Sequence, residues 1–251
     1  MDELAEMVSF GGGVNTIAMV TMLVKQGWHG SIVFADTGGE NPKTHCYMDH
    51  YERTFLRPHG LEIVRLSPAT HPELYDDKRL GGLANTLEDY CLKRGIIPLL
   101  AVRWCSVQFK RNPLENWRTS HNLSRTLMGI CTDEPGRVHW DDPTVGYPLV
   151  DAGINRKECM RIIQRAGLEL PVKSGCFFCP GQSLGQWRTL YHEYPDLYER
   201  AARLEENASA HCQKWATLDP KGISVREKAR RRWEGEEPMD LSRWLPCACT
   251  L

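Results

Sequence analysis

Three consecutive glycines, Gly11, Gly12 and Gly13, separate a short apolar run from a segment with helical periodicity. Residues 6–10 predict a strand, and residues 16–25 repeat apolar side chains at the spacing of a helix. A glycine-rich turn between a strand and a helix lets backbone amides approach a phosphate group. The spacing is neither that of a dinucleotide fingerprint nor that of a Walker loop. The alternative is a tight turn that binds no ligand.

Strand-like and helix-like segments continue to alternate after the glycines. This alternation predicts an α/β fold with a doubly wound parallel sheet. We divide the chain into a nucleotide-binding domain, residues 1–170, and a helical C-terminal region, residues 171–251, which carries a cysteine loop and a cysteine tail. The predicted strands are residues 6–10, 31–35, 61–66 and 127–131, the predicted helices are residues 16–25, 42–56, 156–166, 183–192 and 195–210, and residues 68–85 are predicted to form a loop.

The composition fits a globular protein, with 251 residues, 41% apolar residues and a formal net charge of −1. We find no signal peptide or membrane-spanning run and expect a cytoplasmic protein. The ten cysteines exceed what a cytosolic core requires, so a subset is predicted to bind metal or to perform redox chemistry. The scattered ones are interpreted as small buried apolar residues: Cys46, Cys91, Cys131, Cys159 and Cys212.

The sharpest chemical pattern is GCFFCP, which contains Cys176 and Cys179. A C-x-x-C loop bends two thiolates toward one centre, and four thiolates suit either tetrahedral zinc or an iron–sulfur cluster. The tail adds Cys247 and Cys249, and Cys105 is a further candidate. Free thiols that form a redox or sulfur-carrying disulfide are the third interpretation.

Three other features have both a functional and a structural interpretation. Asp133 and Glu134 follow the fourth predicted strand, where they would hold magnesium against a triphosphate or lie in a solvated turn. Residues 226–232 carry five basic side chains, typical of a nucleic-acid contact or of a solvated helix face. Tryptophans would stack on bases or pack a small C-terminal subdomain: Trp215, Trp233 and Trp244.

The glycine segment SFGGGVNT resembles the PP-loop of ATP pyrophosphatases, S-G-G-x-D-S, with Asn15 at the position of the aspartate and Thr16 at that of the last serine. The segment FADTGGENPKT resembles the D-T-G-x-x-x-P-E-T region of phosphoadenosine phosphosulfate (PAPS) reductases. The nucleotide-binding residues that the two resemblances imply are Ser9, Gly11, Gly12, Gly13, Val14, Asn15, Thr16, Asp36, Thr37 and Gly38.

Two later segments resemble the same family. RWCSVQFKRNPLENW is similar to the C-C-x-x-x-K-x-x-P-L segment of sulfonucleotide reductases, with Cys105 and Lys110 at matching positions and Ser106 in place of the second cysteine. GYPLVDAGINRKECMRII is similar to the region that precedes the cysteine loop in these proteins. The order of the four motifs resembles the PAPS reductase-like branch of the PP-loop, or adenine nucleotide alpha-hydrolase, superfamily.

This resemblance implies ATP or another adenine nucleotide, Mg²⁺ and a [4Fe–4S] cluster as cofactors, with Zn²⁺ as the alternative metal. The implied catalytic residues are Asp36, Lys110 and Cys249. The implied cluster ligands are Cys105, Cys176, Cys179 and Cys249, with Cys247 as an alternative to Cys249. In the zinc alternative, Cys176 and Cys179 bind the ion together with the two tail cysteines.

The first predicted function is that of an ATP pyrophosphatase that adenylates a substrate for sulfur transfer. A sulfur donor protein and an RNA or DNA substrate are its possible partners, and the oligomeric state is left open. The second is a sulfonucleotide reductase, in which a C-terminal thiolate attacks the sulfur of the substrate. The third is a non-catalytic nucleotide sensor or nucleic-acid binder with structural zinc, for which the replacement of an aspartate by Asn15 is the main argument.

Overall fold

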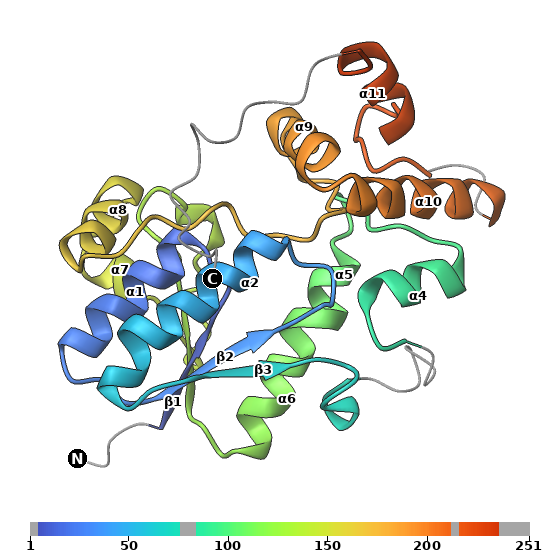
Figure 1. Ribbon diagram of the computed structural model, residues 1–251. Helices are drawn as coiled ribbons and strands as arrows, with labels where there is room; N and C mark the ends of the chain where they lie inside the picture. Colours follow the sequence, from blue (N-terminus) through green and yellow to red (C-terminus); the bar gives the residue numbers. More distant parts are fainter. Residues whose placement is uncertain (1–4, 76–83, 212–215, 236–251) are drawn as a thin grey trace.

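The computed structural model describes residues 5–75, 84–211 and 216–235. Within these residues a sheet of five parallel strands has the order β3-β2-β1-β4-β5 (Figure 1). Since β2 and β3 lie on one side of β1, and β4 and β5 on the other, the winding reverses between β1 and β4. The predicted doubly wound α/β fold is confirmed. The strands are β1 (Glu6–Ser9), β2 (Ser31–Ala35), β3 (Ile63–Leu66), β4 (Arg125–Met128) and β5 (Val145–Gly146).

Helices connect the strands and continue the chain beyond β5. The helices are α1 (Val14–Lys25), α2 (Pro42–Tyr51), α4 (Leu87–Arg94), α5 (Trp104–Ser106), α6 (Asn112–Ser120), α7 (Pro148–Asp151), α8 (Arg156–Arg165), α9 (Leu184–Glu193), α10 (Pro195–His211) and α11 (Val225–Arg232). Asn41 caps α2 as expected, because its side chain accepts a hydrogen bond from the Lys43 amide at 2.9 Å.

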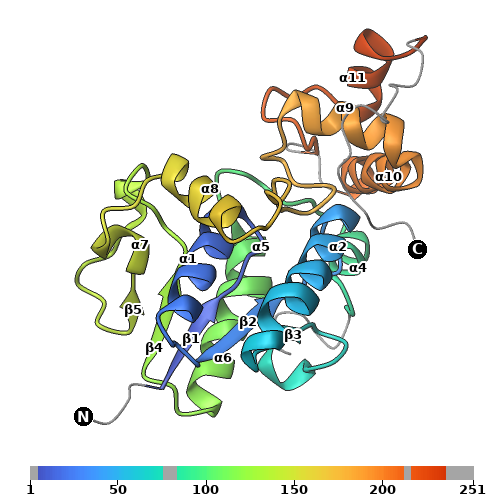
Figure 2. The ribbon, with the colours of Figure 1, turned by 60° about the vertical axis from the view of Figure 1, so that its left-hand side comes forward.

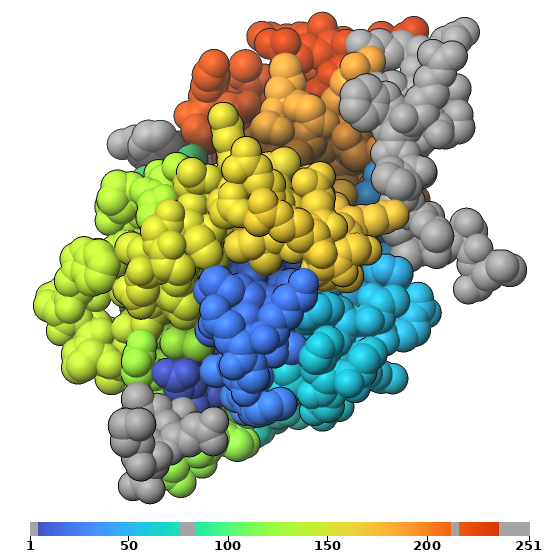
Figure 3. Space-filling view, turned by 90° about the vertical axis from the view of Figure 1, so that its left-hand side faces the viewer, coloured from blue at the N-terminus to red at the C-terminus, as the bar shows by residue number. Residues whose placement is uncertain are grey.

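The two faces of the sheet pack against different helices because strand side chains alternate in direction. Val8 and Phe34 share a core with residues of α1, α2 and α8. Met7 and Val33 point to the opposite face and share a core with residues of α6. Figure 2 shows these helices around the sheet, and Figure 3 shows side chains of α8 lying directly against those of α1. The core layers therefore leave the strand ends as the edge where polar ligands can approach.

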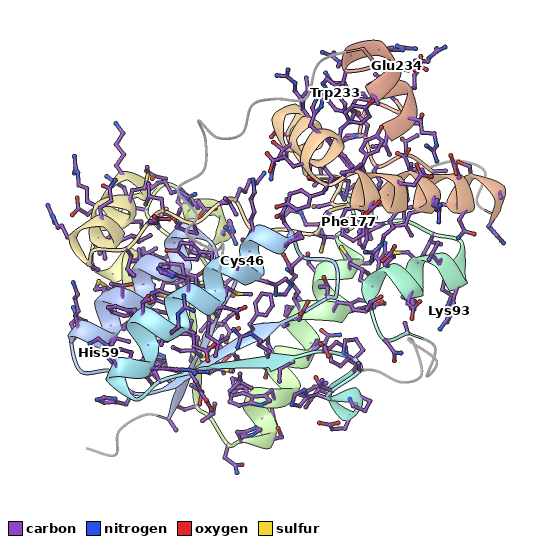
Figure 4. The ribbon with its side chains drawn as sticks, in the orientation of Figure 1. Cys46, His59, Lys93, Phe177, Trp233 and Glu234 are labelled. Atoms are coloured by element: carbon purple, nitrogen blue, oxygen red, sulfur yellow. The ribbon has the colours of Figure 1, made fainter. Side chains whose placement is uncertain are left out.

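Helices α9, α10 and α11 form a C-terminal lobe that packs on α4. Arg200 of α10 is ion-paired with Glu88 of α4, and the Arg200 guanidinium lies 4.9 Å from the centre of the Phe177 ring. Figure 4 shows Phe177 beside α10 at the base of the lobe. Trp233 of the lobe belongs to the same core as Met7 of β1. The division of the chain at residue 170 stays a prediction.

The structure corrects several element boundaries. The strand predicted at residues 127–131 is β4, which ends at Met128, because Gly129 passes too close to α1 for a strand to continue. A Cβ atom on Gly129 would lie 2.7 Å from Thr16 Oγ1. The predicted helix over residues 42–56 is α-helical only to Tyr51 and then continues as a π-helical turn. Strand β5 and helices α4, α5, α6 and α7 were not predicted.

Candidate active site

A cavity of about 170 Å³ lies at the point where the winding reverses. Residues at the carboxyl ends of β1, β2 and β4 line this switch-point cavity, and open α/β sheets bind their ligands at such points. Of the predicted site residues, Ser9, Gly11, Thr16 and Lys110 belong to its lining. Sequence and topology therefore agree on the position of the candidate nucleotide site.

The glycine loop, residues 11–13, leads directly into α1. Gly12 has a positive φ of 65°, which favours glycine. Gly13 is the N-cap of α1, and no side chain caps this end of the helix. The first backbone amides of a helix lack partners within the helix and form a favourable position for an anion. The uncapped start of α1, beside the cavity, fits the phosphate-binding role predicted for these glycines.

Asn15 is held in a buried polar network. Its Nδ2 donates to Glu134 Oε2 at 2.9 Å and to Cys131 Sγ at 3.3 Å. Its Oδ1 accepts from Arg156 Nη1 at 2.8 Å. The amide therefore joins α1 to the segment after β4 and to α8, and all its hydrogen-bonding groups are engaged by protein partners.

Asp133 and Glu134 are part of the same network. Asp133 Oδ2 accepts from the Arg156 amide at 2.6 Å, and Glu134 Oε1 accepts from Arg137 Nη1 at 2.5 Å. These contacts give both carboxylates structural partners. Sequence reasoning missed Arg156, which reaches the PP-loop region only through tertiary packing.

Asp36 lies at the end of β2, at the same edge of the sheet. Its Oδ1 accepts from the Gly38 amide at 2.7 Å, which closes a turn, and its Oδ2 lies 3.8 Å from His45 Nε2. Gly38 has a positive φ of 72°, and a Cβ there would lie 2.4 Å from Thr86 Cγ2. The turn therefore requires glycine and holds Asp36 at the strand end.

The loop after β2, residues 36–41, is bonded to the cysteine loop, residues 175–180. The Phe177 amide donates to the Gly39 carbonyl at 2.7 Å, and the Asn41 amide donates to the Gly175 carbonyl at 3.0 Å. The Thr37 hydroxyl lies 3.2 Å from Cys176 Sγ. Two segments far apart in sequence thus form one unit at the edge of the sheet.

Lys110 connects this unit to the switch-point cavity. Its Nζ donates to Glu40 Oε1 at 2.6 Å, and the Glu40 side chain is only 1% exposed. Burial lowers the pKa of Lys110, but the nearby Glu40 carboxylate and Cys176 outweigh that effect and raise the pKa above its usual value. Lys110 is therefore positively charged at neutral pH. Sequence reasoning missed Glu40, since an acid before Asn41 has no signal that distinguishes it from a surface residue.

Three predicted thiols come together around this pair. Burial raises the pKa of Cys176 to about 12, and Glu40 contributes in the same direction, while Lys110 opposes it. Burial also raises the pKa of Cys105, and neighbouring Cys179 raises it further. These are high values for free thiols, and a bound metal would favour the thiolate forms. The structure thus gathers Cys105, Cys176 and Cys179 beside Lys110.

A fourth thiol, Cys91 on α4, lies near this group. Burial raises its pKa, with smaller contributions from Cys105 and Cys176. Tyr90 and Trp104, the residues before Cys91 and Cys105, pack with ring centres 5.5 Å apart. The prediction that the scattered cysteines are buried is confirmed for Cys91, Cys131 and Cys159 and is wrong for Cys46, which is exposed, while Cys212 lies outside the described residues. Cys247 and Cys249 lie outside the described residues.

The described cysteines are all free thiols. In the described part of the chain, no group of three His, Cys, Asp or Glu side chains is arranged to hold a single metal ion.

The basic run on α11 has partners within the lobe. Arg226 is bonded to Glu199 and Glu206, and Lys228 Nζ lies 2.7 Å from Asp219 Oδ2. Trp233 is buried, which favours the packing interpretation, while Trp215 and Trp244 lie outside the described residues. These ion pairs favour a structural role for the run. Over the described ranges, no helix has the length and apolar character needed to cross a membrane.

The fold and the site define an α/β protein with a glycine loop at the switch point of its parallel sheet. No family model matches the chain. An uncharacterized protein of Methanocaldococcus jannaschii is 24% identical over 231 residues, which cover 82% of this chain and 42% of that protein. The chain thus spans less than half the length of this relative.

Two solved structures are similar to this one. The PAPS reductase of Candida auris, in a phosphate complex, has a TM-score of 0.49 and 13% identity over 68% of this chain and 76% of that chain. The U34-tRNA thiolase NcsA of Methanococcus maripaludis, with its [4Fe–4S] cluster, has a TM-score of 0.46 and 16% identity over 90% of this chain and 80% of that chain. At these identities the similarity concerns the fold alone.

Proposed function

We propose that this protein binds an adenine nucleotide at the switch-point cavity and uses it to activate a substrate oxygen for replacement by sulfur. The observation that carries the proposal is the contact chain from Lys110 through Glu40 to Cys176. It joins the cavity to the group of thiols through a 2.6 Å ion pair and the paired backbones of Glu40 and Cys176. A nucleotide site and a sulfur site are thereby brought within a few side chains of each other.

The chain's own residues supply the phosphate contacts. The first amides of α1 follow Gly11 and precede Thr16, both of which line the cavity, and they would stabilise charge on phosphate oxygens. The Thr16 hydroxyl and the charged Lys110 amine belong to the same lining and would add to that stabilisation. We assign Asp36, at the end of β2, to the ribose or to the metal.

Mg²⁺, when bound, would neutralise phosphate charge and orient the triphosphate. Asn15, Asp133 and Glu134 are engaged by protein partners. Asp36 keeps its Oδ2 beyond hydrogen-bond distance of His45, at 3.8 Å. Asp36 is therefore the carboxylate at this edge that best fits a magnesium ligand.

The thiols fit an iron–sulfur cluster in donor chemistry, because Cys105, Cys176 and Cys179 converge from two separate segments. We propose that the fourth thiolate comes from Cys249 or Cys247 of the tail, or from Cys91. Phe177 and Phe178, both buried, exclude water from the thiol group.

The proposed reaction balances without a change of oxidation state. A carbonyl oxygen of the substrate bonds to the α-phosphorus of ATP, and pyrophosphate leaves. A hydrosulfide ion then adds to the carbon, the activated oxygen departs with AMP, and the proton of the hydrosulfide passes to solvent. Adenylation turns a poor leaving group into a good one, and Lys110 stabilises the charge that develops on the phosphate.

The test begins with nucleotide binding measured by calorimetry. A Gly12→Val substitution places a side chain where phosphate would approach, and its Cβ would already lie 3.2 Å from Met48 Sδ. The matched control is Gly167→Val, which also replaces a glycine of positive φ but has open space around it. We expect only the first variant to lose ATP affinity. Equal affinity in both would refute the nucleotide site.

The same preparations separate the three predicted functions. Iron with acid-labile sulfide, together with ATP binding, supports sulfur transfer. Release of sulfite from PAPS or adenosine phosphosulfate, abolished by Cys249→Ser, would instead assign a reductase. Stoichiometric zinc with no nucleotide turnover would assign a binding protein.

A further inference from the structure

The hydroxyl of Tyr75 is buried and has no hydrogen-bond partner among the described residues. The residue as a whole is only 5% exposed. Most buried polar atoms of folded proteins have a partner, and one that is left unpaired destabilises the fold. A bound ligand can supply the partner that this hydroxyl lacks.

Contacts on two sides fix the position of Tyr75. The turn that precedes it, Pro72–Leu74, follows β3 and packs against α6. There, Asn116 Nδ2 donates to the Leu74 carbonyl at 2.7 Å. The centre of the Tyr75 ring lies 6.3 Å from that of the buried Phe109 ring. The ring is thus held by the packing, while its hydroxyl takes no part in that packing through a hydrogen bond.

Tyr75 lies next to the switch-point cavity. Ala35 and Leu114 line the cavity and belong to the same buried cluster as Tyr75. Burial raises the pKa of Tyr75, and the nearby carboxylate of Asp36, the residue after Ala35, raises it further. The phenol is therefore neutral at neutral pH and can both donate and accept a hydrogen bond.

Asp36 also retains hydrogen-bonding capacity. Its Oδ1 accepts from the Gly38 amide at 2.7 Å, but its Oδ2 lies 3.8 Å from His45 Nε2, beyond hydrogen-bond distance. A carboxylate oxygen and a phenol hydroxyl near each other match two neighbouring hydroxyl groups, because the carboxylate accepts from one and the phenol contacts the other. The ribose of a nucleotide carries such a pair at its 2′ and 3′ positions.

We propose that the Tyr75 hydroxyl binds the ribose of the nucleotide beside Asp36 and selects ribonucleotides over deoxyribonucleotides. The inference rests on the proposed nucleotide site. Of the two roles assigned to Asp36, it supports the contact with ribose. Tyr75 lies outside the four segments that resemble a known family, so only the tertiary structure points to it.

Calorimetry would measure the affinities of ATP, 2′-deoxy-ATP and 3′-deoxy-ATP for the anaerobically purified full chain and for Tyr75→Phe. The substitution removes one oxygen and keeps the ring against Phe109. In the natural chain, the analogue that lacks the contacted hydroxyl should bind about fivefold more weakly than ATP, the loss typical of one hydrogen bond between neutral groups. Tyr75→Phe should weaken ATP binding by a similar factor and change the affinity for that analogue less than twofold. Such non-additive losses identify two groups in direct contact.

Tyr198→Phe is the matched control, because it removes a buried hydroxyl that donates to a protein partner, the Val225 carbonyl in the lobe. We expect this control to lower the free energy of unfolding, measured by urea titration, and to keep the affinity for ATP. Tyr75→Phe should not lower the free energy of unfolding, because its hydroxyl loses no protein partner. If Tyr75→Phe is destabilised as much as Tyr198→Phe, the hydroxyl has a structural role and the proposal is wrong.

The nucleotide titrations separate the ribose contact from the nucleotide site itself. If Tyr75→Phe keeps its affinity for ATP, or loses affinity equally for ATP and both analogues, the ribose contact is wrong while the nucleotide site stands. If the unmodified chain binds none of the three nucleotides, the proposed site is wrong and the ribose contact is wrong with it. The analogue whose affinity does not respond to Tyr75→Phe identifies which of the two ribose hydroxyls is contacted.

Discussion

The side chains of Asn15 and Arg156 meet beside the glycine loop, where Arg156 Nη1 donates to Asn15 Oδ1 over 2.8 Å. The opposite end of the Asn15 amide donates to Glu134. An amide can bridge a cation and an anion in this way, because it offers an acceptor and a donor at once. An aspartate at position 15 offers only acceptors.

We therefore expect Asn15→Asp to destabilise the protein at pH 7. The new carboxylate would face Glu134 Oε2, which now lies 2.9 Å from Asn15 Nδ2. A lost buried hydrogen bond and a like-charge contact together predict a decrease of about 1–3 kcal/mol in the free energy of unfolding. Urea titration measures this change. Adding Glu134→Gln should restore the stability, because the glutamine amide can donate to the new carboxylate; no recovery would contradict the bridging role.

Gly39→Ala should displace the cysteine loop. A Cβ at position 39 would lie 2.8 Å from Phe178 Cε1, and Phe178 is fully buried, so its ring has no open space to enter. Overpacking of this kind costs about 1–3 kcal/mol. We expect less iron per chain and unchanged ATP affinity. Gly136→Ala, which meets nothing within 4 Å, is the control; equal iron content in both variants would show that the contact is unimportant.

Single Cys→Ser variants should identify the metal ligands. We expect a brown anaerobic protein that loses iron and sulfide when Cys105, Cys176 or Cys179 is replaced. The exposed Cys46 is the control and should keep both. Cys91→Ser and Cys249→Ser then distinguish the candidates for the fourth thiolate, because only replacement of a true ligand should lower the iron content. If the variants at Cys105, Cys176 and Cys179 all retain iron, the cluster hypothesis is wrong.

Glu205 should make the stability of the lobe depend on pH. Burial raises its pKa from 4.5 to about 7, although the Val225 and Leu218 amides and Lys228 act in the opposite direction. The folded state thus binds the Glu205 proton more tightly than the unfolded state between these two values. Stability from this group is present below about pH 4.5 and is lost as the pH rises to about 7.

The expected loss across that window is a few kcal/mol, because one pKa unit corresponds to about 1.4 kcal/mol. Glu205→Gln carries no titrating proton. The free energy of unfolding of the natural protein, measured relative to this variant, should fall between pH 4.5 and 7 and stay constant above it. A constant difference across the range would mean that Glu205 is ionised throughout.

Local patterns in the sequence predicted the fold well where an apolar run extended over several residues. The runs that became β1 and β2 combine apolar residues with a following turn, and the spacing of Cys176 and Cys179 predicts a tight loop without any tertiary information. Strand β5 could not be predicted, because Val145 and Gly146 are too short a segment to show periodicity.

Residues of the candidate site could be predicted only where they belong to a recognisable sequence motif. Ser9 and Lys110, which line the switch-point cavity, were named through resemblance to known segments, and their role in binding stays a prediction. Glu40 and Arg156 act through contacts with residues 70 and 141 positions away, Lys110 and Asn15 respectively. No pattern within a local window of the sequence indicates such contacts.

Met7 in the first strand and Trp233 near the end of the described chain belong to one core. During synthesis on the ribosome, the apolar residues that link the sheet to the lobe in this core therefore lack part of their partners until most of the chain has been made. A core that joins distant parts of the sequence slows folding and leaves apolar surface exposed for longer. The nascent protein is consequently most prone to aggregate after its sheet has formed and before α11 has been translated.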